Sequence, residues 1–329
     1  MRGRTVSLIV VGLGAFALVA ALCVRLIMAP DLVKLPLDQE ALPEATGSDV
    51  TMFDFATMDE VSGVDAVVLQ KVAGDPGADG AGDDLAVWNF GSTIQTADGT
   101  LLDESSYRVC IDRRTAASDP ECPSASVDGR PDATIDGLTL TFPFHTEKRD
   151  YELFNLTAAQ SFPATFSGVE EIDGLEVYRF EQAIPETVVE QKEVPGAMAG
   201  QPGDASVEGD FVYTNTRTLW VEPTSGVIVT AEETPLIVIR GPEGKTGVTW
   251  LSASFAATDE TLSDGLDRAR DTRGQITAIE TVVPLSLAGL GLLLLIVGAL
   301  LMRRRGDAAA GPRHEDDGTE RPLQDAQAY

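Results

Sequence analysis

The stretch TRTLWVEPTSGVIVTAEE, residues 216–233, has the pattern of two β-strands joined by a tight turn. Leu219 and Val221 lead into the turn two residues apart, and Val227 and Val229 lead out of it with the same spacing. A period of two places these side chains on one face of each strand. Pro223, near the start of the link, and a late glycine suit a type I turn. The stretch therefore predicts an antiparallel β-hairpin.

Strand-like segments recur on both sides of this hairpin. Six are 65–73, 85–96, 107–112, 175–182, 235–241 and 246–258. A seventh, GLTLTFPFH at 137–145, alternates most regularly, with an apolar face of Leu138, Leu140, Phe142 and Phe144 and a polar face of Thr139, Thr141, Pro143 and His145. Two segments rich in Gly, Pro and Asp, 74–84 and 194–210, are predicted loops. Many short strands separated by turns predict a mainly β (α+β) fold with a β-sandwich or barrel-like domain.

Two long apolar segments lie near the ends of the chain. Thr5 to Val24 gives 20 residues without a charge, and Val282 to Met302 gives 21. Each is long enough to cross a bilayer as a helix. Arginines precede the first segment and follow the second, so the positive-inside rule predicts two membrane spans with both termini cytoplasmic. The first span is alternatively a cleaved signal peptide, although its long core and the lack of a small-residue cleavage site favour an anchor.

The segment between the β-rich region and the second span has helical spacing. Leu262, Leu266 and Ala269 recur on one face after Thr258. The tail that follows the second span is polar and mixed in charge. The sequence therefore predicts an N-terminal tip and membrane helix at 1–28, an extracytoplasmic β-rich domain at 29–257, a helical stalk at 258–281, a membrane helix at 282–302 and a disordered cytoplasmic tail at 303–329.

Charge limits the partners that the protein can have. The chain has 52 acidic and 24 basic residues, a formal net charge of −28, and the acidic residues concentrate between the two spans. Such a surface repels nucleic acid and anionic headgroups at long range. We therefore expect the lipid bilayer as a partner and no nucleic acid. Small residues in the spans, Ala17 and Ala21 in the first and Gly289, Gly291 and Gly298 in the second, suit helix contacts within the chain or in a homo-oligomer.

Cysteines and acidic residues supply the candidate sites. Cys110 and Cys122 lie in the predicted extracytoplasmic domain, where an oxidising compartment favours a disulfide between them. The loop at 74–84 is predicted to be a solvated acidic loop, and calcium binding is the weaker alternative; its acidic residues are Asp75, Asp79, Asp83 and Asp84.

No catalytic constellation stands out. His145 is one of two histidines, and the other, His314, lies in the predicted cytoplasmic tail. A catalytic triad would therefore depend on His145. Its place on the polar face of a strand predicts an architectural role. We expect no catalytic residue, no cofactor and a non-enzymatic protein.

Three stretches resemble a known family. TFPFHTEKRDYELFN (141–155), FPATFSGVEEIDGLEVYRFEQAIPET (162–187) and TRTLWVEPTSGVIV (216–229), with LPLD after the first span, resemble an actinobacterial family catalogued as PorA-type porins. The resemblance extends over nearly the whole chain, including its two-anchor layout. It implies a place in the cell envelope and supplies no reaction, cofactor or catalytic residue. The layout is also similar to that of class B scavenger receptors, which pass lipids through a tunnel in the ectodomain.

Three functions remain open at this point. The first is an anchored ectodomain that binds or transfers a hydrophobic envelope ligand, or binds an envelope protein. The second is a porin or channel component, as the family resemblance implies. The third is an extracytoplasmic enzyme that uses carboxylates.

Overall fold

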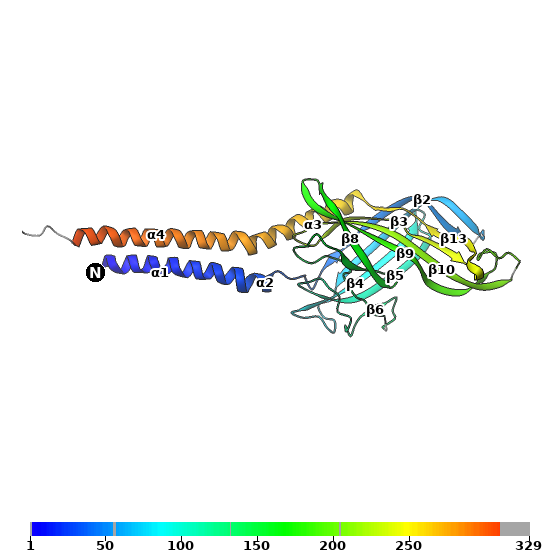
Figure 1. The fold of residues 1–329 in the computed structure, drawn as a ribbon, viewed down its shortest axis with the longest axis horizontal. Coiled ribbons are helices and arrows are strands. Elements are labelled where there is room, and N and C mark those ends of the chain that lie inside the picture. The colour runs from blue at the N-terminus through cyan, green and yellow to red at the C-terminus, as the bar shows by residue number, and fades with distance from the viewer. Residues whose placement is uncertain (1, 55–56, 132, 204, 310–329) are drawn as a thin grey trace, which may run out of the picture. The chain divides into compact units, whose positions relative to one another are not determined.

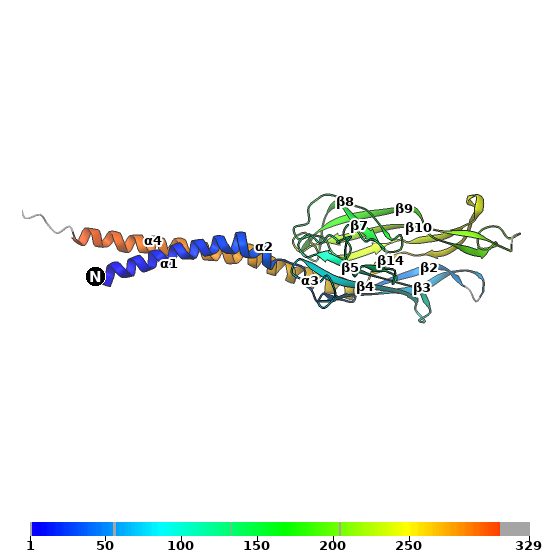
Figure 2. The same cartoon turned by 90° about the horizontal axis from the view of Figure 1, so that it is seen from below.

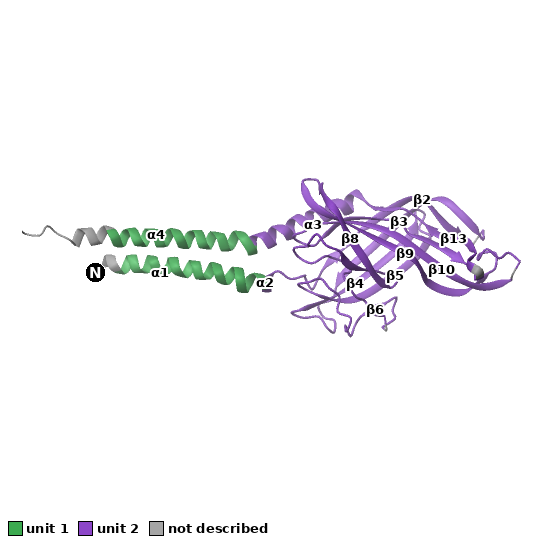
Figure 3. Cartoon of the chain, viewed as in Figure 1, with its two compact units in different colours: residues 1–30, 279–329 green, residues 31–278 purple. Residues whose placement is uncertain are grey.

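The chain forms two compact units. The computed structural model describes residues 2–54, 57–131, 133–203 and 205–309. Unit 1 comprises Met1–Pro30 with Ile279–Tyr329, and unit 2 comprises Asp31–Ala278 (Figure 3). Unit 1 therefore contains the two apolar segments, and unit 2 contains the β-rich domain.

The long helices lie towards the two ends of the chain, and the strands lie between them. The helices are α1 (Arg2–Cys23), α2 (Ala29–Leu32), α3 (Asp259–Thr277) and α4 (Val283–Ala309), with the π-helical turns η1 (Val24–Met28) and η3 (Ala278–Val282) and the 3-10 turn η2 (Pro242–Gly244). The strands are β1 (Glu40–Ala41), β2 (Glu44–Asp54), β3 (Asp59–Gly74), β4 (Leu85–Thr96), β5 (Leu101–Asp112), β6 (Ser126–Val127), β7 (Tyr151–Asn155), β8 (Gln160–Ile172), β9 (Leu175–Pro195), β10 (Ser206–Val221), β11 (Ile228–Glu233), β12 (Leu236–Arg240), β13 (Thr246–Ser252) and β14 (Phe255–Ala257).

One antiparallel sheet makes up most of unit 2 (Figure 1). Its strand order is β6-β5-β4-β3-β2-β13-β12-β10-β9-β8-β7. The predicted hairpin is confirmed, because β10 pairs with β11 and Val221 lies opposite Ile228. Its link differs from the expected type I turn: Gly226 N donates to Glu222 O, four residues back, at 2.9 Å. The left-handed φ of 72° at Gly226 makes this wider turn possible.

The sheet folds back on itself, so that β2–β5 face β7–β10 across a shared interior (Figure 2). Single bridges join its two ends: Ile111 of β5 bridges Ser118, Ala117 bridges Leu138, and Leu138 bridges Leu153 of β7. Leu138 N donates to Glu152 O at 2.8 Å, and Phe154 N donates to Leu138 O at 2.8 Å. The predicted barrel-like, mainly β fold is therefore confirmed.

The prediction that 137–145 is a strand is wrong. Leu138 contributes only isolated bridges, and no ladder includes the segment. The first part of its polar face is not solvated either, because Thr139 and Thr141 are both 7% exposed, whereas His145 at the end of the segment is exposed. The segment bridges the two sheet ends without forming a ladder, so its alternation did not signal a strand.

Several strands, among them β3, β5, β9 and β10, are longer than their sequence patterns indicated. All six further predicted segments lie largely in strands, but β9 alone runs for 21 residues through Pro185. β2, β7 and β8 were not predicted, and β9 and β10 extend into the predicted loop at 194–210. Register shifts near Phe211 and Tyr213 show why: bulges interrupt the period of two without ending the pairing.

Helix α3 covers most of the predicted stalk and packs on the sheet within unit 2. Thr258 caps it, accepting a hydrogen bond from Thr261 N at 3.2 Å. Leu266 and Ala269 are buried against Leu175, Val177 and Val229 of the sheet. Helix α4 continues to Ala309, past the predicted end of the membrane helix at 302, and residues 310–329 of the predicted disordered tail lie outside the described residues.

Helices α1 and α4 pair antiparallel within unit 1, and both are long and apolar enough to cross a membrane. Gly14 lies against Gly291, and Gly298 lies against Val11. The seam, the line of contact between α1 and α4, consists of the buried small residues Ser7, Gly14, Ala17, Ala21, Gly291 and Gly298. Close backbone approach through small residues is how membrane helices gain packing energy. Gly289, which the sequence suggested as a contact, has nothing within 4 Å of an added Cβ.

Replacing Gly291 with leucine should separate this helix pair. An added Cβ would stand 2.8 Å from Gly14 O, so we expect a loss of about 1–3 kcal/mol. The measurement is thermal unfolding of the helical circular dichroism signal in mild detergent. Gly289→Leu is the matched control and should change the midpoint little; equal shifts in both variants would contradict the observed seam.

Candidate functional site

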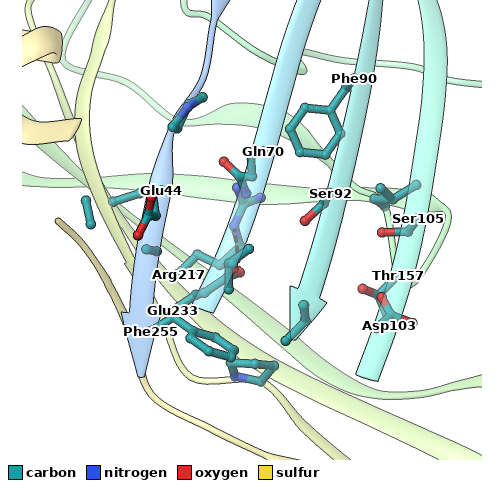
Figure 4. Close-up of a pocket in the computed structure, with 18 of the residues that line it drawn as sticks. Glu44, Gln70, Phe90, Ser92, Asp103, Ser105, Thr157, Arg217, Glu233 and Phe255 are labelled. Carbon is teal, nitrogen blue, oxygen red and sulfur yellow. Dashed lines mark ion pairs between the residues drawn. The ribbon is translucent and has the colours of Figure 1, made fainter. Parts of the chain in front are cut away.

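The candidate functional site is a cavity of about 620 Å³ inside the folded sheet. Side chains from β2, β3, β4 and β5 point into the same space as Arg217 and Glu233 (Figure 4). Helix α3 contributes Thr261, Gly265 and Arg268. The volume lies within the range of ligand sites, about 300–1,000 Å³.

Much of the cavity wall is apolar. The sheet folds so that one face of each layer turns inward, and period-two alternation fills that face with large side chains. These include Val68, Val72, Phe90, Ile94, Leu102, Phe154, Leu219, Ile237, Trp250, Leu251 and Phe255. Phe90 and Ile94, although inside the fold, remain only partly buried because they face open space. An apolar molecule would gain free energy by entering.

A polar wall, defined by Tyr107, Thr139, Asn155, Tyr213, Arg217 and Glu233, interrupts this lining. Asn155 Nδ2 and Asn215 Nδ2 both donate to Tyr213 Oη, at 3.3 and 2.8 Å. Burial raises the pKa of Tyr213, and the nearby charge of Glu233 acts in the same direction. Tyr213 is therefore neutral over the physiological range.

Arg217 lies in this wall with its charge only partly compensated. Its Nη1 donates to Gln182 Oε1 at 3.1 Å, and its Nε lies 3.6 Å from Glu233 Oε2. The Gln182 side chain is itself fully buried and donates to Leu153 O at 2.6 Å. This chain of contacts fixes the guanidinium at the cavity surface.

Arg268 reaches the cavity from α3. Burial lowers its pKa, an effect that the nearby Asp264 carboxylate opposes. Within the described ranges of the chain Arg268 makes no ion pair, unlike Arg270, which pairs with Asp173 at 2.7 Å. No sequence pattern indicated either cavity arginine, because they belong to distant segments that only the folded sheet brings together.

The predicted metal candidates are not gathered around one point. Asp75 Oδ2 lies 3.3 Å from Arg108 Nη2, and Asp84 Oδ1 lies 2.9 Å from Arg114 Nη1. Asp79 accepts from Ser124 through its backbone carbonyl, and Asp83 accepts from Arg113 in the same way. Over the residues that the structure describes, no group of three His, Cys, Asp or Glu side chains could hold a metal ion.

Cys110 and Cys122 form a disulfide beside this acidic loop. They pack with Val87 in a small buried cluster. Replacing both with alanine should lower the free energy of unfolding by about 3 kcal/mol, because the loop between them has a separation of 12 residues. Urea denaturation with and without reductant measures this; Cys23→Ala should shift nothing, and a double variant as stable as the parent would contradict the expectation.

Residues 141–146 and 222–227 hold each other in what we call the clasp. Phe142 N donates to Gly226 O at 2.9 Å, and Thr146 N donates to Pro223 O at 2.7 Å. Thr141 Oγ1 also donates to Gly226 O, at 2.9 Å. The two stretches singled out in the sequence therefore contact each other directly.

His145 belongs to the clasp through its backbone. Its N–H donates to Thr224 O at 3.1 Å, its φ is 55°, and its side chain is exposed. On the other side of the turn, the buried Glu222 carboxylate accepts from Ser225 N at 2.7 Å and lies 3.8 Å from Arg273 Nε of α3. The clasp thus joins the segment at 137–145, the closing segment, to the hairpin and the stalk.

Comparison with known proteins identifies the family. The sequence model of the porin PorA family matches residues 6–300. The chain belongs to the porin PorA family. Among its relatives, Porin PorA of Corynebacterium amycolatum is 29% identical over 66% of this chain and 70% of its own length. Porin PorA of Corynebacterium resistens is 26% identical over 83% of this chain and 84% of its own length.

Membership of the PorA family agrees with the resemblance found in the sequence. The matched residues include most of both apolar helices, the clasp and the cavity. The family and the two apolar helices together indicate a membrane protein of the cell envelope.

Proposed function

We propose that the protein is a non-enzymatic envelope membrane protein whose β-rich unit binds a hydrophobic ligand and passes it on. The single observation that carries the proposal is the cavity of about 620 Å³, of whose wall apolar side chains make up more than half. A sheet without function would be expected to fill such a space, since unfilled apolar cavities cost stability. The ligand would be an envelope lipid or the apolar part of another envelope component.

The arginines around the two spans support a particular orientation. We propose that both termini are cytoplasmic and that unit 2 lies outside, because Arg303 and its neighbours follow the second span while acidic residues dominate between the spans. A carrier in this position would have access to lipids outside the membrane. Its acidic charge would make nucleic acid an unfavourable partner.

Lipid analysis of the purified protein tests the proposal. The full chain is purified from native membranes in mild detergent, and bound lipids are extracted and identified by mass spectrometry. We expect a lipid retained at a near-stoichiometric level. If the protein retains no more lipid than a control membrane protein with two spans, the carrier proposal fails.

A pore component is the second candidate. The observation that favours it is the name Porin PorA carried by both relatives. The outward side chains of α1 and α4 are apolar, so one copy supplies no polar pore lining, and a channel would require a homo-oligomer. Planar-bilayer recording of the purified protein tests this candidate. Stepwise conductance would support a pore, and the absence of conductance across a range of voltages and lipids would exclude a pore under those conditions.

A further inference from the structure

Two buried hydroxyl groups in the polar wall have unused hydrogen-bonding capacity. Thr139 Oγ1 is buried and has no hydrogen-bond partner among the described residues that meets the usual distance and angle limits. Tyr107 is, like Thr139, only 7% exposed, and its hydroxyl lies beside that of Thr139. Both residues line the cavity. Because an unpaired buried polar group costs free energy, its presence here calls for an explanation.

Arg217 lies near the same two groups. Burial raises the pKa of Tyr107, while the charge of Arg217 and the nearby Thr139 hydroxyl oppose that rise. The guanidinium can donate five hydrogen bonds, and Gln182 and Glu233 engage only part of that capacity. The three side chains come from the closing segment, β5 and β10, so the folded sheet alone brings them together.

The wall therefore offers donors and few free acceptors. Arg217 can only donate, and the Glu233 carboxylate is already engaged by Arg217 and by Asn215 Nδ2, the latter at 3.1 Å. The Tyr107 and Thr139 hydroxyls lie beside each other, so a contact between them uses at most one of their two protons and the other can be donated to a ligand. The complement to such a wall is a group that only accepts, with apolar surface attached to it.

We propose that Tyr107, Thr139 and Arg217 bind the carbonyl oxygen of a long-chain acyl group whose hydrocarbon part occupies the apolar cavity. This inference rests on the proposed ligand-binding function and specifies its ligand. A carboxylate and an ester both present such an oxygen, so a free fatty acid and an esterified lipid are two sources of the same chemistry. A hydrocarbon lacks the oxygen and would leave the hydrogen-bond donors of the polar wall without an acceptor.

Three probes of equal chain length test the proposal on the delipidated full chain in mild detergent. They are palmitate, methyl palmitate and hexadecane, each measured by competition against a fluorescent fatty acid. We expect at least one acyl probe to bind about 3- to 10-fold more tightly than hexadecane, as one neutral hydrogen bond or more would give. Preference for palmitate would assign the free acid, and preference for the ester would assign an esterified lipid. Equal affinity for all three would overturn the acyl assignment while leaving a hydrophobic carrier intact, whereas binding of none would overturn the carrier as well.

Thr139→Val separates a binding role from a structural one. The substitution keeps the shape of the side chain and removes the unpaired hydroxyl, so the melting temperature should rise while affinity for the acyl probe falls about 3- to 10-fold. Affinity for hexadecane should not change. Thr141→Val is the matched control: this threonine is equally buried but donates to Gly226 O, so its loss should lower the melting temperature and leave binding unchanged.

Tyr107→Phe provides a second, independent variant. It removes the other hydroxyl without changing the ring, and it should weaken acyl binding by a similar factor. Full acyl affinity in both Thr139→Val and Tyr107→Phe would overturn the proposal.

Discussion

Gly226→Ala is expected to lower the free energy of unfolding by about 3–5 kcal/mol, because two costs add at one position. The φ of 72° is unfavourable by about 1–2 kcal/mol for any residue with a Cβ. The new Cβ would also press against the carbonyl oxygen of Phe142 and stand 2.8 Å from that of Pro143. Relief requires the closing segment to move, which breaks the hydrogen bonds of the clasp.

Gly174→Ala is the matched control for this variant. Gly174 also ends a hairpin turn, with a φ of 74°, but an added Cβ meets nothing within 4 Å. We expect only the conformational cost, about 1–2 kcal/mol. Urea denaturation of the full chain in detergent, followed by fluorescence of Trp88, Trp220 and Trp250, reports on unit 2 alone. Equal losses in the two variants would show that the clasp does not constrain the fold.

Ser92→Trp is expected to reduce the hydrophobic ligand retained on purification by at least about tenfold. Ser92 lies opposite Ser105 in the β4–β5 ladder, and both side chains line the cavity (Figure 4). An indole at this position would occupy the space that a ligand needs. Overpacking of an occupied site costs about 1–3 kcal/mol, and tenfold corresponds to about 1.4 kcal/mol.

Ser106→Trp is the control for the cavity variant. Ser106 follows Ser105 on β5 and is exposed, because successive side chains of a strand point to opposite faces. Lipid mass spectrometry and thermal unfolding are measured on both variants. Undiminished lipid in a folded Ser92→Trp protein would show that the retained lipid binds elsewhere, for example around α1 and α4.

Short-range patterns in the sequence predicted several elements correctly. The hairpin at 216–233 combines a period of two with a glycine near the end of the turn, and these signals depend only on neighbouring residues. The two apolar segments exceed the length of a membrane span, which composition alone reveals. The stalk helix has both a cap at Thr258 and a buried stripe through Leu266.

The errors arose where local pattern and tertiary contact disagree. The segment at 137–145 alternates like a strand, yet it lies between the sheet ends and forms single bridges. The acidic residues of the loop at 74–84 were only a weak calcium candidate, and arginines from other segments pair with Asp75 and Asp84. Strand lengths were underestimated because bulges shift the alternation while the backbone pairing continues.

The sequence by itself determined the class of fold, the two apolar helices, the disulfide partners and the family, because each depends on composition, spacing or similarity along the chain. The cavity, by contrast, was decided by the tertiary structure. Its polar wall joins Tyr107, Thr139 and Arg217, which belong to three separate segments and carry no shared motif. Only the closure of the sheet through Leu138 brings them to one surface, because strand pairing between distant segments is a property of the folded chain.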